Sequence, residues 1–120
     1  LTRKPPAGQK ILWINILIEN IGLSEQSLPA VEHFSVLYGT SEFKSVYGHR
    51  QGNTDYSTFK PLIYQGQKVD AWLRFDVPLD AGLQELQFAF MPDSFQMNFS
   101  FPSSGYSWAD HPIYLWQCGR

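Results

Sequence analysis

Apolar residues occupy every second position in two long stretches of the chain, residues 11–20 and 69–78, and most polar residues of these stretches lie between them. A period of two is typical of a β-strand that buries one face. The first stretch has its aliphatic residues at even positions and the second at odd positions. We therefore predict two long strands that face a common core. The apolar positions are Leu12, Ile14, Ile16 and Ile18 in the first, and Val69, Ala71, Leu73, Phe75 and Val77 in the second.

Shorter apolar stretches, separated by turn-forming residues, occupy much of the remaining chain. They cover residues 33–39, 43–47, 61–64, 83–92, 95–102 and 113–118. No stretch of ten or more residues shows the 3.6-residue period of a helix. The pattern predicts an all-β, antiparallel sandwich of about seven or eight strands over residues 11–120. Residues 1–10, which are basic and contain two prolines, are predicted to be an N-terminal tail.

The phase of the alternation predicts which side chains form the core. Nine residues from three strands are expected to be buried, because a shift of one position would turn each apolar face to water. They are Leu12, Ile14, Ile16, Ile18, Leu73, Phe75, Val77, Phe88 and Phe90.

Composition excludes several classes of function. Only 17% of residues are charged, and the formal net charge is -2, which disfavours a nucleic-acid-binding surface. Cys118 is the only cysteine, so no disulfide within the chain is possible, and we interpret it as a bystander rather than a nucleophile. No apolar run approaches the roughly 20 residues that a membrane-spanning helix needs.

Catalytic and metal-binding motifs are missing from the sequence. There is no glycine-rich phosphate loop, no GxSxG elbow and no HExxH. The carboxylates of Asp76 and Asp80 flank a strand end, where solvated turn residues are the better interpretation. Four loop residues could in principle bind a metal, but their spacing matches no common site, so we expect no metal and no cofactor. These four are His49, Asp55, Asp110 and His111.

Four short motifs follow one another along residues 10–92. They are a strand ending in Glu-Asn with a glycine beyond it, a Phe-x-Val segment closed by glycine, a glycine turn leading to Phe-x-Val-Pro, and a Leu/Phe-rich strand ending in proline. Their residues are Ile18, Glu19, Asn20 and Gly22; Phe34, Val36 and Gly39; Gly66, Phe75, Val77 and Pro78; and Leu86, Phe88 and Pro92.

This order of motifs resembles the immunoglobulin-like domains of unknown function that are found in bacterial lipoproteins and other cell-envelope proteins. The resemblance implies an immunoglobulin-like sandwich and an extracytoplasmic location, either secreted or anchored to the envelope. It brings no catalytic residues with it, so we expect a non-catalytic module. Residues 93–120 are longer and richer in aromatic residues than the pattern leads us to expect.

The candidate binding residues lie on the polar phase of the two long strands. Trp13, Leu17, Trp72 and Arg74 all occupy this phase. If the two strands pair, as the corresponding strands of immunoglobulin-like sheets commonly do, these side chains share the outer face of one sheet. Trp108, in the aromatic loop 103–112, is a further candidate.

Three interpretations of this outer face remain open. The face is covered by residues 1–10 or 103–118, or it binds a protein partner or a second copy of the chain, or its Trp and Tyr side chains bind a carbohydrate. The sequence thus predicts a protein-interaction or envelope-structural module, with a carbohydrate-binding module as the alternative.

Overall fold

The computed structural model describes residues 4–48, 52–58, 62–92 and 113–119. Within these ranges the chain forms eight β-strands and three short 3-10 turns, and no α-helix. The strands are β1 (Gln9–Glu19), β2 (Gln26–Ser27), β3 (Phe34–Tyr38), β4 (Ser41–Lys44), β5 (Leu62–Ile63), β6 (Lys68–Pro78), β7 (Leu86–Phe90) and β8 (Tyr114–Gln117). The 3-10 turns cover Val31–His33, Tyr56–Thr58 and Leu83–Glu85. No helix in these ranges has the length and apolarity needed to cross a membrane.

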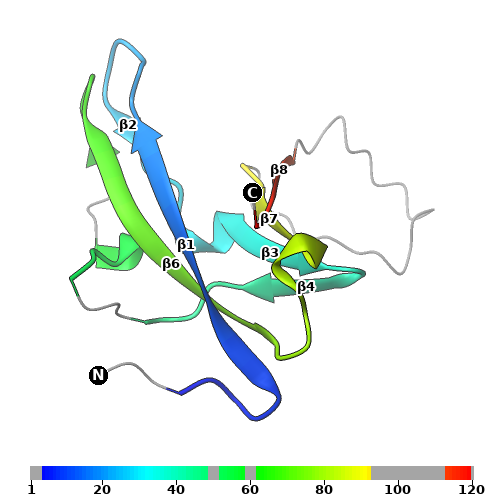
Figure 1. The fold of residues 1–120 in the computed structure, drawn as a ribbon. Helices are drawn as coiled ribbons and strands as arrows, with labels where there is room; N and C mark the ends of the chain where they lie inside the picture. The colour runs from blue at the N-terminus through cyan, green and yellow to red at the C-terminus, as the bar shows by residue number, and fades with distance from the viewer. Residues whose placement is uncertain (1–3, 49–51, 59–61, 93–112, 120) are drawn as a thin grey trace.

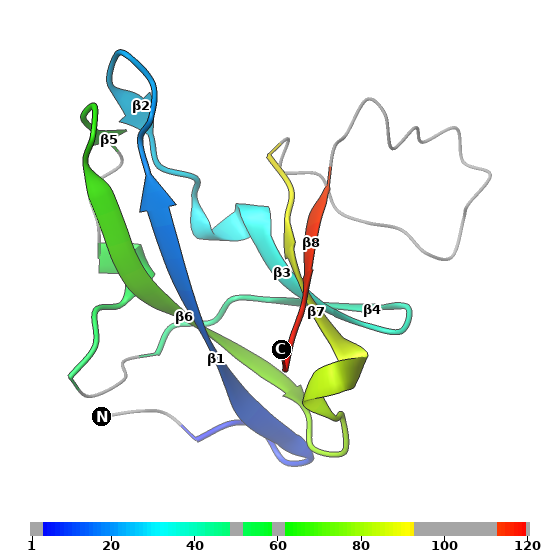
Figure 2. The same cartoon turned by 45° about the horizontal axis from the view of Figure 1, so that its top comes forward.

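The two long strands, β1 and β6, pair with each other in an antiparallel ribbon. The register places Leu12 opposite Phe75 and Ile16 opposite Ala71, so the aliphatic positions of both strands share one face. The predicted pairing and phase of these two strands are confirmed. Figures 1 and 2 show the ribbon as one long, twisted layer of the molecule.

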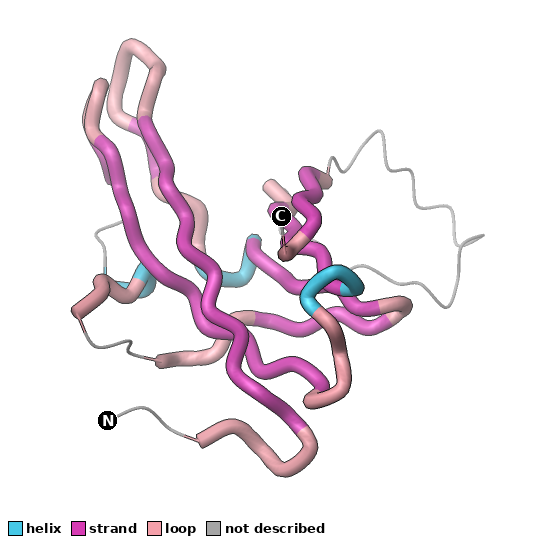
Figure 3. Tube along the Cα trace, viewed as in Figure 1, coloured by secondary structure: helices cyan, strands magenta, loops and turns pink. Residues whose placement is uncertain are grey.

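The second layer is a four-stranded antiparallel sheet with the order β4-β3-β7-β8. Strands β3 and β4 are joined by a two-residue turn, in which Gly39 has a φ of 58°. This left-handed conformation suits glycine, which has no Cβ to clash. The tight turn makes β4 start at Ser41, slightly earlier than the predicted strand 43–47. Strands β2 and β5 form a small separate pair near the end of the ribbon (Figures 2 and 3).

The core lies between the inner faces of the two layers. Phe34, Val36, Leu86 and Phe88 from the second sheet pack with the inner residues of β6. The prediction of an all-β, antiparallel sandwich is therefore confirmed at this level. Residues 95–102, predicted to form a further strand, lie outside the described ranges.

Five of the nine predicted core residues are buried: Ile16, Leu73, Phe75, Val77 and Phe88. The other four face the core but are only partly buried, which corrects the prediction that all nine are buried. They are Leu12, Ile14, Ile18 and Phe90. All four border an opening between the two layers, which accounts for their remaining exposure.

Candidate functional site

The predicted outer-face residues come together on one face of the β1–β6 ribbon. Directly opposite residues of an antiparallel pair point to the same side of the sheet. Trp13 lies opposite Arg74, and Asn15 lies opposite Trp72, so Trp13 and Trp72 are diagonal neighbours. Both indoles are partly buried, and neither presents a fully open platform.

Arg74 is buried beneath a neighbouring loop, with only 2% of its surface exposed. Its Nε donates to Oδ1 of Asp76 at 2.9 Å, which pairs the two charges. Gly48 lies so close to the Arg74 side chain that a Cβ added there would be 2.4 Å from Arg74 Cδ. Arg74 therefore anchors the loop and does not lie on an open binding surface.

The segment that covers Arg74 also occupies the second edge of β6. The amide of Val46 donates to the carbonyl of Arg74 at 3.0 Å, and the amide of Trp72 donates to the carbonyl of Thr54 at 2.8 Å. Coverage by residues 1–10 or 103–118 was one of three interpretations of the outer face; the described backbone contacts at this edge come from Val46 and Thr54. Strand β6 thus has neighbours along both of its edges.

Of the remaining predicted binding residues, Leu17 is described by the structure. Leu17 is on the same face but is 66% exposed. Trp108 lies outside the described residues, as do His49, Asp110 and His111. In the ranges that the structure describes, no three His, Cys, Asp or Glu side chains gather as metal ligands would.

The more developed surface feature is an apolar groove of about 670 Å³ between the two layers. Every residue from Leu12 to Ile18 lines it, including those whose side chains point outward. Consecutive residues of a strand can all border one cavity when the strand presents its edge to it. We call this cavity the edge groove, and β1 forms one of its walls.

Strand β1 is an edge strand within the described part of the chain. There it pairs with β6 alone, along all eleven residues of each strand. The peptide groups on its other side therefore line the edge groove without a strand partner among the described residues. An edge of this length, without bulge or proline, is a template for another strand.

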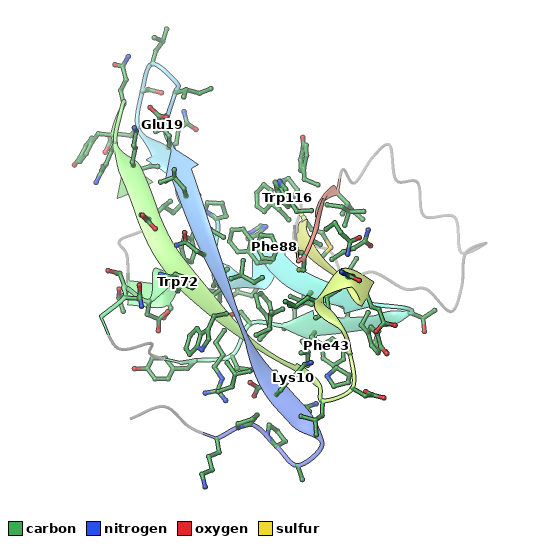
Figure 4. All side chains as sticks on the ribbon, in the orientation of Figure 1. Lys10, Glu19, Phe43, Trp72, Phe88 and Trp116 are labelled. Carbon is green, nitrogen blue, oxygen red and sulfur yellow. The ribbon has the colours of Figure 1, made fainter. Side chains whose placement is uncertain are left out.

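The opposite wall of the edge groove comes from the second sheet. Trp116 on β8 packs against Phe88 on β7 with ring centroids 5.7 Å apart, and both line the groove (Figure 4). Phe34 and Phe90 extend this aromatic wall, with ring centroids 5.2 Å apart. Trp116 is 53% exposed, so part of its indole packs against Phe88 and the rest forms an accessible rim of the groove.

The walls contain few polar side chains. Asn15 and Gln117 are polar, and no Asp, Glu, Lys, Arg or His is among the described lining residues. Burial raises the pKa of the Cys118 thiol, so the thiol stays protonated at neutral pH and is a poor nucleophile. The described lining is therefore suited to uncharged, apolar groups.

Sequence analysis missed the edge groove because its walls come from distant parts of the chain, residues 12–18 on one side and residues of β3, β7 and β8 on the other. One signal was present: residues 113–118 are apolar on both faces, although one face of an outer strand usually meets water. Residues 12–18 also lack charge, and a charged residue is a common protection of an exposed edge.

The described residues form a small all-β domain with an apolar groove between its two layers. The chain matches the family described as a domain of unknown function (DUF4352) over residues 2–98, and it belongs to that family. No curated protein and no solved structure was found to match it.

Proposed function

We propose that this domain is a non-catalytic protein-interaction module that binds an extended segment of a partner by adding it as a strand to β1. The observation that carries the proposal is the edge groove. It places the edge of β1 that has no strand partner among the described residues beside an apolar wall that includes Phe88, Phe90 and Trp116.

Strand addition uses both features of the groove. Backbone amides and carbonyls of an edge strand supply hydrogen bonds that do not depend on the partner's sequence. Alternate side chains of the added strand then point to one side, where Phe88, Phe90 and Trp116 offer apolar contacts. The partner segment should therefore be uncharged and should carry an apolar residue at every second position.

The composition of the groove disfavours the carbohydrate alternative. A sugar needs several polar side chains around its hydroxyl groups in addition to an aromatic platform. The described walls provide two such residues, Asn15 and Gln117. Trp13 and Trp72, which were the expected platforms, are partly buried.

We further propose an immunoglobulin-like strand order and an extracytoplasmic location, secreted or anchored to the bacterial cell envelope. The support is the order of short motifs over residues 10–92. An envelope-structural role would use the same groove, with another envelope protein as the source of the added strand.

Peptide binding tests the proposed function. The probe is a fluorescein-labelled nine-residue peptide of alternating valine and threonine, with one lysine at each end for solubility. We expect saturable binding, and we expect Trp116→Ser to weaken it at least tenfold, because Trp116 forms the accessible rim of the groove.

The matched control is Tyr64→Ser, which removes an aromatic residue that is 63% exposed and lies outside the groove. It should leave the affinity unchanged, and circular dichroism should show that both variants are folded at the temperature of the assay. Absence of saturable binding, or equal loss in the two variants, would overturn the proposed function.

A further inference from the structure

We infer that the strand accepted by β1 is β1 of a second copy of this chain, so that the edge groove is a homodimer interface. The inference rests on the proposed function and names the partner for the same surface. In the dimer, two ribbons would join edge to edge into one antiparallel sheet with the order β6-β1-β1-β6.

The sequence of β1 is complementary to itself in one antiparallel register. A twofold axis that is perpendicular to the sheet and passes midway between the two copies of Asn15 places residue i of one copy opposite residue 30 − i of the other. On the outer face, Asn15 then meets Asn15 of the second copy, and Trp13 meets Leu17 of the second copy. On the inner face, Leu12 meets Ile18 and Ile14 meets Ile16. Every pair in residues 12–18 is matched in polarity.

The register keeps the inner and outer faces of both copies aligned. Odd positions oppose odd positions, and even positions oppose even ones, so each copy's aliphatic face stays on the core side. A shift by one residue would place the inner aliphatic residues of one copy opposite the outer residues of the other. Face alignment thus allows only a small set of registers. Among them, the register centred on Asn15 places the only polar residue of segment 12–18 opposite its own copy.

Charge does not oppose this pairing. Residues 11–18 contain no charged side chain, and Glu19 lies opposite Ile11 of the second copy. The nearest cation, Lys10, donates from Nζ to the carbonyl of Ala81 at 2.6 Å, which keeps it with its own chain. Two copies therefore bring no like charges together along the shared edge.

The pairing would also cover surface that the single chain leaves exposed. Leu17 has the most exposed of the large apolar side chains of β1. In the dimer it would contact the indole of Trp13 from the second copy. A two-stranded ribbon is marginal by itself, whereas four strands with a common apolar face are stable. The second copy's inner aliphatic residues would lie at the mouth of the edge groove, next to Trp116.

Sedimentation velocity and cysteine cross-linking test the inference. The full chain should sediment as a dimer that dissociates on dilution. In a Cys118→Ser background, Asn15→Cys should form an intermolecular disulfide on mild oxidation, because directly opposite Cβ atoms in an antiparallel pair are about 4.5–5.5 Å apart.

Leu17→Cys in the same background is the control for register. Its two copies would be four residues apart along the strand, or about 13 Å, which is beyond disulfide reach. Cross-linking of Leu17→Cys in preference to Asn15→Cys would overturn the proposed register, and a chain that stays monomeric at all concentrations would overturn the dimer.

A charge variant provides the second measurement. Asn15→Lys would place two lysines next to each other across the twofold axis. Within each monomer, the Asp70 carboxylate, which accepts a hydrogen bond from Asn15 at 2.8 Å, can pair with the new lysine, so the fold should be kept. We expect at least a tenfold weaker dimer. Gln26→Lys adds the same charge on exposed β2 and should leave the dimer unchanged. A monomeric chain that still binds the Val/Thr peptide would contradict the homodimer alone, whereas loss of peptide binding in a folded monomer would contradict both proposals.

Discussion

Tyr56 shows how one side chain ties a loop to the core. It is 4% exposed and packs edge-on against Phe34, with ring centroids 5.5 Å apart. Its hydroxyl donates to the carbonyl of Pro29 at 2.5 Å, a contact between residues 27 positions apart. Burial raises the pKa of Tyr56 to about 12 from the ordinary value of 10.0. The buried hydroxyl is therefore harder to ionise than a tyrosine in the unfolded chain.

This pKa predicts a loss of stability at high pH. Below pH 10 Tyr56 is neutral in both states, and its contribution is complete. Between pH 10 and about 12 the unfolded chain releases this proton while the folded chain retains it, so the free energy of unfolding falls. Tyr56→Phe should lose about 1 kcal/mol at neutral pH, where it leaves the Pro29 carbonyl without its donor.

Urea denaturation from pH 8 to 12 measures the effect as a difference between the parent chain and Tyr56→Phe. The other tyrosines are common to both proteins and cancel in the comparison. The two curves should converge as the pH rises above 10. Parallel curves over the whole window would show that the Tyr56 hydroxyl ionises as easily in the folded chain as in the unfolded one.

At the scale of elements, the segment that follows β4 is held against β6 by a close approach of backbone to side chain. Gly48 is buried on the Arg74 side chain, and a Cβ there would lie 2.4 Å from Cδ and 3.2 Å from Cβ of Arg74. Arg74 cannot easily move away, because Asp76 holds its guanidinium. Glycine is therefore required here by space, and no positive φ is involved.

Gly48→Ala is expected to destabilise the domain by about 1–3 kcal/mol, the usual cost of overpacking a well-filled site. Combining it with Arg74→Ala removes the group that the new methyl meets. The double variant should then lose less stability than the sum of the two single variants, as expected for residues in contact. Urea denaturation of the three variants checks this, and additive losses would rule out the contact as the cause.

At the scale of the whole molecule, Phe75 connects the two layers. It lies on β6, is fully buried, and packs edge-on against Phe88 of β7 with ring centroids 6.1 Å apart. Because this contact joins strands from different sheets, its loss weakens the docking of the layers as well as the strand itself.

Phe75→Ala should reduce the free energy of unfolding by about 3–5 kcal/mol, from lost burial and the cavity that remains. Lys68→Ala, on the outer face of the same strand and exposed, should change it by at most about 0.5 kcal/mol. Chemical denaturation of both variants is the measurement. Similar losses at the two positions would contradict the assigned strand faces.

Much of the fold could be predicted because β-strand alternation is a local property. In β1 and β6, the positions of Ile16, Leu73, Phe75 and Val77 alone indicate which face is buried. A shift of either strand by one residue would expose several aliphatic side chains, so the phase has no close competitor. The pairing of β1 with β6 followed from the order of strands in domains with similar motifs, and the structure confirms it.

The position of Arg74 and the edge groove depended on contacts between distant parts of the chain. Alternation places Arg74 on the outer face, but only the folded chain brings Gly48 over it. In the same way, Leu12, Ile14 and Ile18 have the phase of core residues, yet they border an opening because β8 lies across from the edge of β1. Periodicity reports which face of a strand is apolar, and the tertiary structure decides what lies against that face and which strand edges remain accessible.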